Sequence, residues 1–292
     1  MPDAFRHGLQ SGRRRQVRPV AGWQADLAHA LQREELEVHY QPKLHACDGR
    51  LSGVEALVRW HHPRVGWVPP EDLIAFCERH RLIVQLGRWV VRAVCRQLAD
   101  WQRTEGLRIA ASINLSPLQL DSPSLADYFD EQMREHGLQP DQLSFEITES
   151  WSLAASGAAD DFFRVLRQRG FGLSIDDFGS GYSSLSRLWR VPANELKIDA
   201  YFVQNVAADP AVQIVVKAAV DLAHALGMRL VAEGVETEAQ CEALVRLGCD
   251  ELQGYVFSPA LPPAQLSLWV RGRMRAADAP APHGAAPSAL IG

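Results

Sequence analysis

The amino-acid sequence predicts an α/β protein folded as a single TIM-type (β/α)8 barrel. The chain has 292 residues, and a barrel of this type needs about 250. Short apolar, β-branched segments alternate with amphipathic helical segments, which is the pattern of repeated βα units. No G-x-G-x-x-G turn or P-loop follows an early strand, which disfavours an open, doubly wound sheet.

Eight segments have the composition expected of strands. In chain order they are residues 36-40, 52-60, 108-115, 143-147, 172-176, 195-199, 229-233 and 250-255. Signals for helix boundaries lie between several of them, namely a P-P-E-D start before Leu73, a Ser122-Pro123 start for a helix ending at Gly137, and Thr237-Glu238 opening a helix that stops at Gly248. Eight parallel strands with helical crossovers can close on themselves as a barrel.

We expect residues 23-274 to form the barrel and the two ends to be tails or linkers. Residues 1-22 contain a run of arginines without an apolar period, which favours a solvated segment over one that binds acidic lipid or another domain. Residues 275-292 are rich in Ala and Pro, which predicts a disordered C-terminal tail.

Bulk composition narrows the partners and the compartment. The net charge of -5 gives no reason to expect duplex nucleic acid as a partner. The five cysteines are odd in number and form no C-x-x-C pair, which argues against disulfides and structural zinc. The sequence has no apolar signal core and no run of about 18 apolar residues. These features predict a cytoplasmic protein without a membrane span.

Polar side chains gather at the ends of the predicted strands. They are Glu55, Asn114, Glu146, Glu149, Asp176, Asp177, Lys197, Asp199, Glu233, Glu236 and Gln253. A parallel strand in a barrel is covered on both faces, so an ionisable residue at its end needs a partner or a metal. The carboxyl ends of all strands meet on one face of a TIM barrel. Any single acid could instead cap the following helix, but the set indicates one shared site.

Hard divalent cations would relieve the repulsion between clustered carboxylates. Oxygen ligands without Cys or clustered His indicate Mg²⁺ or Mn²⁺ rather than Zn²⁺. The adjacent Asp176 and Asp177 could supply a carboxylate that bridges two cations, an arrangement common in in-line attack at phosphorus. The sequence therefore predicts a site for two divalent cations, Mg²⁺ or Mn²⁺.

Several motifs occur together and in order. They are Y-Q-P-K at 40-43, E-A-L-V-R-W at 55-60, I-N-L-S at 113-116, F-E-I-T-E-S at 145-150, D-D-F-G-S-G-Y-S-S-L at 176-185, L-K-I-D at 196-199, A-E-G-V-E at 232-236 and Q-G-Y-V-F at 253-257. Over roughly residues 25-270 the chain resembles the EAL family of cyclic di-GMP phosphodiesterases. The resemblance implies an EAL variant of the barrel, in which the first strand can run antiparallel to the rest.

The resemblance also assigns roles to individual residues. The positions matching metal ligands are Glu55, Asn114, Glu146, Asp176 and Asp177, with Asp176 shared between two metals. Lys197 and Glu233 match positions near the attacking water, and which of them acts as base stays open. Those matching substrate contacts or the wider active site are Gln41, Arg59 and Gln253.

A glycine-rich segment follows the two aspartates. By resemblance, the loop containing Gly179, Ser180 and Gly181 couples metal binding to dimer contact, and Glu149 holds it. Glycines allow backbone conformations closed to other residues, which is consistent with a mobile loop. An ordinary Gly/Ser turn is the alternative. The resemblance further implies a homodimer and an upstream sensory or GGDEF-like domain.

The implied activity is hydrolysis of cyclic di-GMP to linear pGpG in bacterial second-messenger signalling, with Ca²⁺ expected to inhibit. A receptor that binds cyclic di-GMP without cutting it is disfavoured, because no matched catalytic position is substituted. An unrelated barrel enzyme acting on another phosphodiester does not explain why all the motifs occur together.

Overall fold

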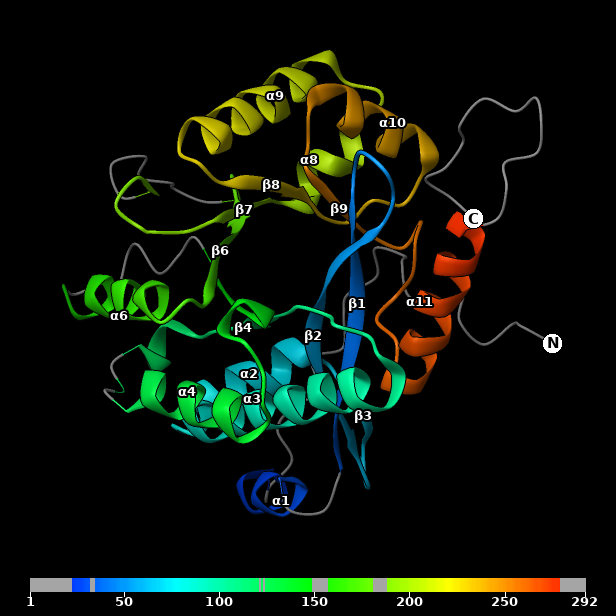
Figure 1. Ribbon diagram of the computed structural model, residues 1–292. Coiled ribbons are helices and arrows are strands. Elements are labelled where there is room, and N and C mark those ends of the chain that lie inside the picture. Colours follow the sequence, from blue (N-terminus) through cyan, green and yellow to red (C-terminus); the bar gives the residue numbers. More distant parts are fainter. Residues whose placement is uncertain are drawn as a thin grey trace.

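A computed structural model describes residues 23–31, 35–120, 122, 124–148, 157–180 and 188–278. Its strands form one sheet in the order β1-β9-β8-β7-β6-β5-β4-β2-β3, and an additional β1–β2 pairing closes the barrel (Figure 1). The strands are β1 (Leu36–His45), β2 (Leu51–His62), β3 (Gly66–Val68), β4 (Ala111–Asn114), β5 (Leu143–Thr148), β6 (Gly172–Phe178), β7 (Glu195–Ile198), β8 (Arg229–Ala232) and β9 (Glu251–Gln253). The predicted closed barrel is confirmed.

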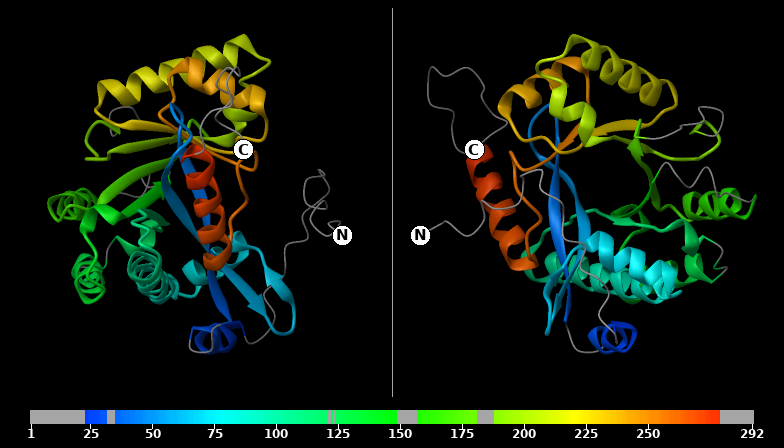
Figure 2. Two further views of the ribbon diagram at one scale, coloured as in Figure 1. Left: turned by 45° about the vertical axis from the view of Figure 1, so that its right-hand side comes forward. Right: turned by 180° about the vertical axis from the view of Figure 1, so that it is seen from behind.

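Helices surround the barrel on its outer side (Figure 1). The α-helices are α1 (Trp23–Ala30), α2 (Pro70–Arg79), α3 (Ile83–Asp100), α4 (Leu125–Glu135), α6 (Gly157–Gln168), α8 (Ala200–Asn205), α9 (Pro210–Ala225), α10 (Glu238–Leu247) and α11 (Pro263–Asp278). The described residues also form three short helical turns, namely the π-helix η1 (Trp101–Glu105) and the 3-10 helices η2 (Pro117–Gln119) and η3 (Pro140–Gln142). Helix α11 lies alongside β1 (Figure 2).

The first strand runs antiparallel to both of its barrel neighbours, β2 and β9, whereas β2 and β4 to β9 pair in parallel. Residues 46-50 join β1 to β2 directly. So short a connection can only make a hairpin, because a parallel pair needs a crossover of a dozen or more residues. The antiparallel first strand is therefore confirmed.

Each predicted strand overlaps an observed one, and the bounds agree within three residues except at the end of β1. Strand β1 continues to His45 instead of ending at residue 40, because its second half pairs with β9 as well as with β2. Strand β3 was not predicted. It has three residues, too few for an alternating pattern, and it forms because it pairs with the end of β2.

Local sequence signals explain the helix ends that were predicted. In α10 the Thr237 hydroxyl and the Gln240 side chain form a capping box, and Gly248 ends the helix with a φ of 92°. Helix α4 ends at Glu135, and Gly137 then takes a φ of 67°. Such positive φ angles suit glycine, which lacks the Cβ that makes them costly.

The apolar core lies between the strands and the helices. On β5, for example, Phe145 stacks on Phe129 of α4 with ring centroids 4.2 Å apart and meets Phe171 edge to face at 5.7 Å. Because neighbouring side chains of a strand point to opposite faces, this packing turns Glu146 toward the barrel interior. The helices thus determine which strand residues face inward.

The observed elements bear on the expected ends of the chain. Helix α11 continues to Asp278, past the expected start of the C-terminal tail at residue 275. Residues 1-22 and 279-292 lie outside the described residues. Among the helices that are described, none is both long enough and apolar enough to cross a membrane.

Candidate active site

The barrel interior is lined by polar residues at alternating strand positions. They are Gln41, Lys43, Glu55, Ser112, Asn114, Glu146, Ser174, Asp176, Glu195, Lys197, Glu251 and Gln253. Between them stand buried apolar residues such as Ile113, Ile175 and Leu196, which face the helices and belong to the apolar core. The period of two in a strand thus separates an apolar outer layer from a polar interior.

Lys197 stands at the centre of the upper interior, near the carboxyl ends of the parallel strands. Its side chain is only 1% exposed, and its Nζ donates to Glu146 Oε2 at 2.6 Å. The same Nζ lies 3.2 Å from Asp176 Oδ2 and also pairs with Glu233 Oε1. One ammonium group therefore forms ion pairs with three carboxylates from three different strand ends.

A second set of contacts joins β1, β2, β4 and β9. Glu55 accepts hydrogen bonds from Asn114 Nδ2 at 2.8 Å and from Gln253 Nε2 at 2.7 Å, one on each carboxylate oxygen. Gln253 Nε2 also lies 3.2 Å from Gln41 Oε1, and Gln41 Nε2 donates to the Ser258 carbonyl at 3.3 Å. These hydrogen bonds orient the side-chain amides of Gln41 and Gln253 and the carboxylate of Glu55.

Burial and like charge raise the pKa of the central carboxyl groups. Desolvation raises the pKa of Glu146 and Asp176, and it raises the pKa of Glu233 further, in each case against the attraction of Lys197. Burial alone would lower the pKa of Lys197, but its carboxylate neighbours carry that pKa well above the ordinary value. The ammonium is therefore charged at neutral pH, but its single positive charge does not neutralise all the carboxylates around it.

Asp177 stands beside this cluster and is half-buried. Partial burial and then the charge of Asp176 raise the pKa of its carboxyl to about 6. Its backbone has a φ of 58°, in the left-handed region that non-glycine residues seldom adopt. Its amide donates to Asp176 Oδ1 at 2.8 Å, which orients the neighbouring carboxylate. Unusual backbone geometry of this kind is frequent at functional sites.

The donor chemistry of this site fits a hard divalent cation. Glutamate, aspartate and asparagine oxygens are the ligands that Mg²⁺ and Mn²⁺ prefer. Glu146 Oε1 is buried and accepts no hydrogen bond from the described part of the chain. Yet no group of three His, Cys, Asp or Glu side chains in the described ranges is already arranged to hold a metal ion, and the point where three carboxylates meet is taken by the Lys197 ammonium group. Cation binding here requires these internal pairs to rearrange.

The structure brings most of the predicted site residues together and separates a few. The residues brought together form two contact groups, one of Glu146, Asp176, Lys197 and Glu233 and the other of Gln41, Glu55, Asn114 and Gln253. Arg59 lies four residues further along β2, half-buried, with Nη1 donating to the Val58 carbonyl at 2.9 Å. Burial lowers its pKa against the opposing effect of Glu55.

The glycine-rich segment is described only in part. Glu149 and Gly181 lie outside the described residues. Gly179 has a φ of 93°, and a Cβ there would lie 2.7 Å from the ring of Phe202. Ser180 donates through its hydroxyl to the Asp177 carbonyl at 2.8 Å. The segment thus begins as a tight turn that only glycine can make at position 179.

Sequence reasoning missed a deeper set of interior charges, namely Lys43, Glu195 and Glu251. Each lies two residues along its strand from a predicted site residue and therefore on the same strand face. The pairs are Lys43 and Gln41, Glu195 and Lys197, and Glu251 and Gln253. That period of two is visible in the sequence and was the signal that could have found them.

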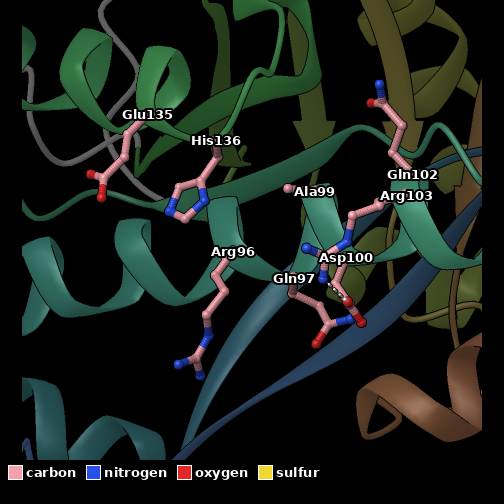
Figure 3. A pocket seen from close by; sticks show the side chains of 8 residues that line it. All are labelled: Arg96, Gln97, Ala99, Asp100, Gln102, Arg103, Glu135 and His136. Atoms are coloured by element: carbon pink, nitrogen blue, oxygen red, sulfur yellow. Dashed lines mark hydrogen bonds and ion pairs between the residues drawn. The ribbon is translucent and has the colours of Figure 1, made fainter.

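A cavity of about 750 Å³ lies elsewhere, on the outer helices (Figure 3). Its lining side chains come from the ends of α3 and α4 and from η1, and they are Arg96, Gln97, Ala99, Asp100, Gln102, Arg103, Glu135 and His136. No strand-end residue lines it. Most of these side chains are exposed or half-buried, so we place the active site at the barrel mouth, where buried carboxylates, amides and a lysine converge.

Comparison with known proteins gives a consistent result. Residues 24–260 match the EAL domain family. The chain is 44% identical over 241 residues to MucR of Pseudomonas aeruginosa, a bifunctional diguanylate cyclase/cyclic di-GMP phosphodiesterase, covering 82% of this chain and 35% of MucR. It is 38% identical over 242 residues to the cyclic di-GMP phosphodiesterase RocR of the same species, covering 82% of this chain and 60% of RocR.

A solved complex of the PaMucR phosphodiesterase with c-di-GMP has the same fold. Its sequence identity is 43% and its TM-score is 0.78, over 83% of this chain and 98% of that one. The chain spans about a third of full-length MucR. With a match that extends from residue 24 to residue 260, this chain belongs to the EAL domain family.

Proposed function

We propose that this chain is a phosphodiesterase that hydrolyses cyclic di-GMP to linear pGpG. The observation that carries the proposal is the convergence of Glu146, Asp176 and Glu233 on Lys197, beside Glu55, at the mouth of an EAL barrel. Relatives named as cyclic di-GMP phosphodiesterases, and the c-di-GMP complex of PaMucR, support the choice of substrate.

Membership of the family implies the use of divalent metal ions. We propose two of them, Mg²⁺ or Mn²⁺, held by Glu55, Asn114, Glu146, Asp176 and Asp177. Such cations would supply Lewis-acid chemistry, because they acidify water and neutralise charge on phosphoryl oxygens. The raised pKa values of Glu146 and Asp176 support this assignment, since they indicate a shortage of positive charge that cations would make good.

Lys197 and Glu233 then have different roles beside the attacking water. Lys197 carries its proton at neutral pH and so cannot accept another, but its Nζ can hold an attacking water or the phosphate by hydrogen bonds. Glu233 is the better base, because a raised pKa makes its carboxylate a stronger proton acceptor. The ion pair with Lys197 opposes this rise in the pKa of Glu233 and points its carboxyl group at the site.

Polar groups beside the carboxylates would hold the substrate. Gln41 and Gln253 orient one another at 3.2 Å and present amide groups at the mouth. Arg59 offers a planar fork that can bind a phosphate or the edge of guanine. Because Nη1 already donates to Val58, the rest of the guanidinium is held in a defined direction.

The direct test is incubation of the purified chain with cyclic di-GMP and Mg²⁺ or Mn²⁺, with Ca²⁺ and with a chelator. We expect pGpG with Mg²⁺ or Mn²⁺ alone. Asp176→Asn should abolish turnover, whereas Asp221→Asn, on the exposed face of α9, should leave it unchanged. Tight binding without product would indicate a receptor. Full activity in Asp176→Asn would refute the ligand assignment.

Three further assignments belong to the proposal. We propose a homodimer, coupled to the site through the segment from Gly179 to Gly181 and Glu149, and a sensory or GGDEF-like domain upstream. The short share of MucR that this chain spans supports a further domain. We place the reaction in the cytoplasm, because the five cysteines are all unpaired, four of them buried. Sedimentation of the chain with and without Mn²⁺ tests the dimer.

A further inference from the structure

A second group of charges, buried except for the half-exposed Arg229, lies directly beneath the active site. Lys43 Nζ pairs with Glu195 Oε1 at 3.1 Å, and Arg229 reaches Glu195 Oε2 at 3.2 Å and Glu251 Oε1 at 3.3 Å. The Ser52 hydroxyl donates to the other oxygen of Glu251 at 2.9 Å. In this lower group two cations balance two carboxylates.

Lys43 also reaches upward into the active site. Its Nζ lies 3.6 Å from Glu146 Oε1, the oxygen that accepts no hydrogen bond in the described ranges. The other oxygen, Oε2, accepts the 2.6 Å hydrogen bond from Lys197. The side chain of Glu146 is fully buried, so each of its two oxygens faces a different buried ammonium group, one from β1 and one from β7.

The two lysines differ in what else they touch. Lys197 contacts Asp176 and Glu233, whereas the other partner of Lys43 is Glu195, two residues before Lys197 on β7. Glu195 also pairs with Arg229, whose Nη2 lies 3.2 Å from Glu195 Oε2. Lys43 therefore faces two carboxylates, Glu195 at 3.1 Å and Glu146 from below at 3.6 Å.

We propose that Lys43 is a positioning residue that anchors Glu146 for cation binding. The inference rests on the proposed function, in which Glu146 is a metal ligand. Groups that orient a ligand from behind commonly contribute about 10- to 100-fold to metal affinity when they are removed. Lys43 is buried beneath the site, so it acts on the reaction through Glu146 and contacts no substrate.

The sign of the effect separates anchoring from simple charge. A positive charge near a cation site repels the cation, so charge alone predicts that Lys43→Met would bind Mn²⁺ more tightly. Anchoring predicts the opposite, because a Glu146 side chain that has lost its contact on one side can turn away from the cation site. Methionine matches the length of the lysine stem and removes only the ammonium group.

The experiment compares four proteins by Mn²⁺ titration, followed by electron paramagnetic resonance, and by steady-state kinetics. We expect Lys43→Met to bind Mn²⁺ at least about tenfold more weakly and to lose kcat, with KM for cyclic di-GMP nearly unchanged. Glu195→Gln is the matched control. It removes the lower partner of Lys43 but keeps the contact with Glu146, so its Mn²⁺ affinity should stay within about threefold of wild type.

A double variant, Lys43→Met with Glu195→Leu, removes the buried carboxylate that the single change leaves paired with Arg229 alone. It should regain stability but not Mn²⁺ affinity, and it carries the test if Lys43→Met alone fails to fold. Unchanged or tighter Mn²⁺ binding by Lys43→Met, or recovery of affinity in the double variant, overturns the inference alone. A wild-type chain that binds no Mn²⁺ and cleaves no cyclic di-GMP overturns the proposed function and the inference with it.

Discussion

Replacing Lys197 with Met removes a positive charge that three buried carboxylates share. The lysine side chain is 1% exposed and that of Glu146 is fully buried, so water cannot replace the lost ammonium group. Glu146 keeps Lys43 at 3.6 Å, but Asp176 and Glu233 lose the cation that faces them. We therefore expect the variant to be strongly destabilised in the absence of divalent cations.

The size of the effect follows from burial. Removing one partner of a buried ion pair costs about 3–5 kcal/mol, because an uncompensated charge is left inside. Since whole domains are stable by only about 5–15 kcal/mol, Lys197→Met should be close to unfolding at neutral pH. Mn²⁺ at 100 times its dissociation constant adds about 2.7 kcal/mol to the free energy of unfolding, so saturating cation should restore much of the loss.

Lowering the pH should also restore the variant. A carboxyl group whose pKa is raised in the folded state binds more protons folded than unfolded, so acid favours folding. The pKa values of Glu146, Asp176 and Glu233 are already raised in the wild type, and losing Lys197 raises them further. Stability of the variant should therefore increase as the pH falls from 7 toward 5.

The assay is urea unfolding at pH 7 and pH 5, with and without Mn²⁺. Lys217→Met is the control, since this exposed lysine pairs with Asp221 at 2.6 Å on the surface of α9, and such pairs contribute about 0–1 kcal/mol. The reasoning is refuted if metal-free Lys197→Met is as stable as Lys217→Met, or if neither Mn²⁺ nor acid stabilises it more than wild type.

Three further predictions concern metal, substrate and backbone. Below pH about 6 the affinity for Mn²⁺ should fall roughly tenfold per pH unit, because protons compete for Asp177, whose pKa is about 6; a titration that is flat from pH 5 to 7 would contradict this. Arg59→Lys should raise KM for cyclic di-GMP roughly tenfold with Mn²⁺ affinity unchanged, and an unchanged KM would remove Arg59 from the substrate site. Gly254→Ala should destabilise the fold by more than about 3 kcal/mol, since its Cβ would lie 2.0 Å from the Val235 carbonyl oxygen. The control is Gly272→Ala, where a Cβ meets nothing within 4 Å. Equal melting temperatures of the two variants would refute the argument.

Local sequence was sufficient to predict most of the barrel. The alternation of strand-like and helical segments predicted all eight barrel strands, and the signals at Thr237 and Gly248 predicted both ends of α10. These features depend on neighbours in the chain, so periodicity and capping chemistry reveal them. Strand β3 was not predicted, because it has only three residues, shows no period of its own and forms by pairing with β2.

The sequence by itself also determined which side chains could form the site, because inward and outward positions alternate along each strand. It did not determine which of them touch. Closure of the barrel brings Lys197 to Glu146, Asp176 and Glu233. It also brings Lys43 between Glu146 and Glu195, the second of which is 152 positions from Lys43 in the sequence. The physical reason is that alternation is a property of one strand, whereas these contacts depend on the register and closure of several.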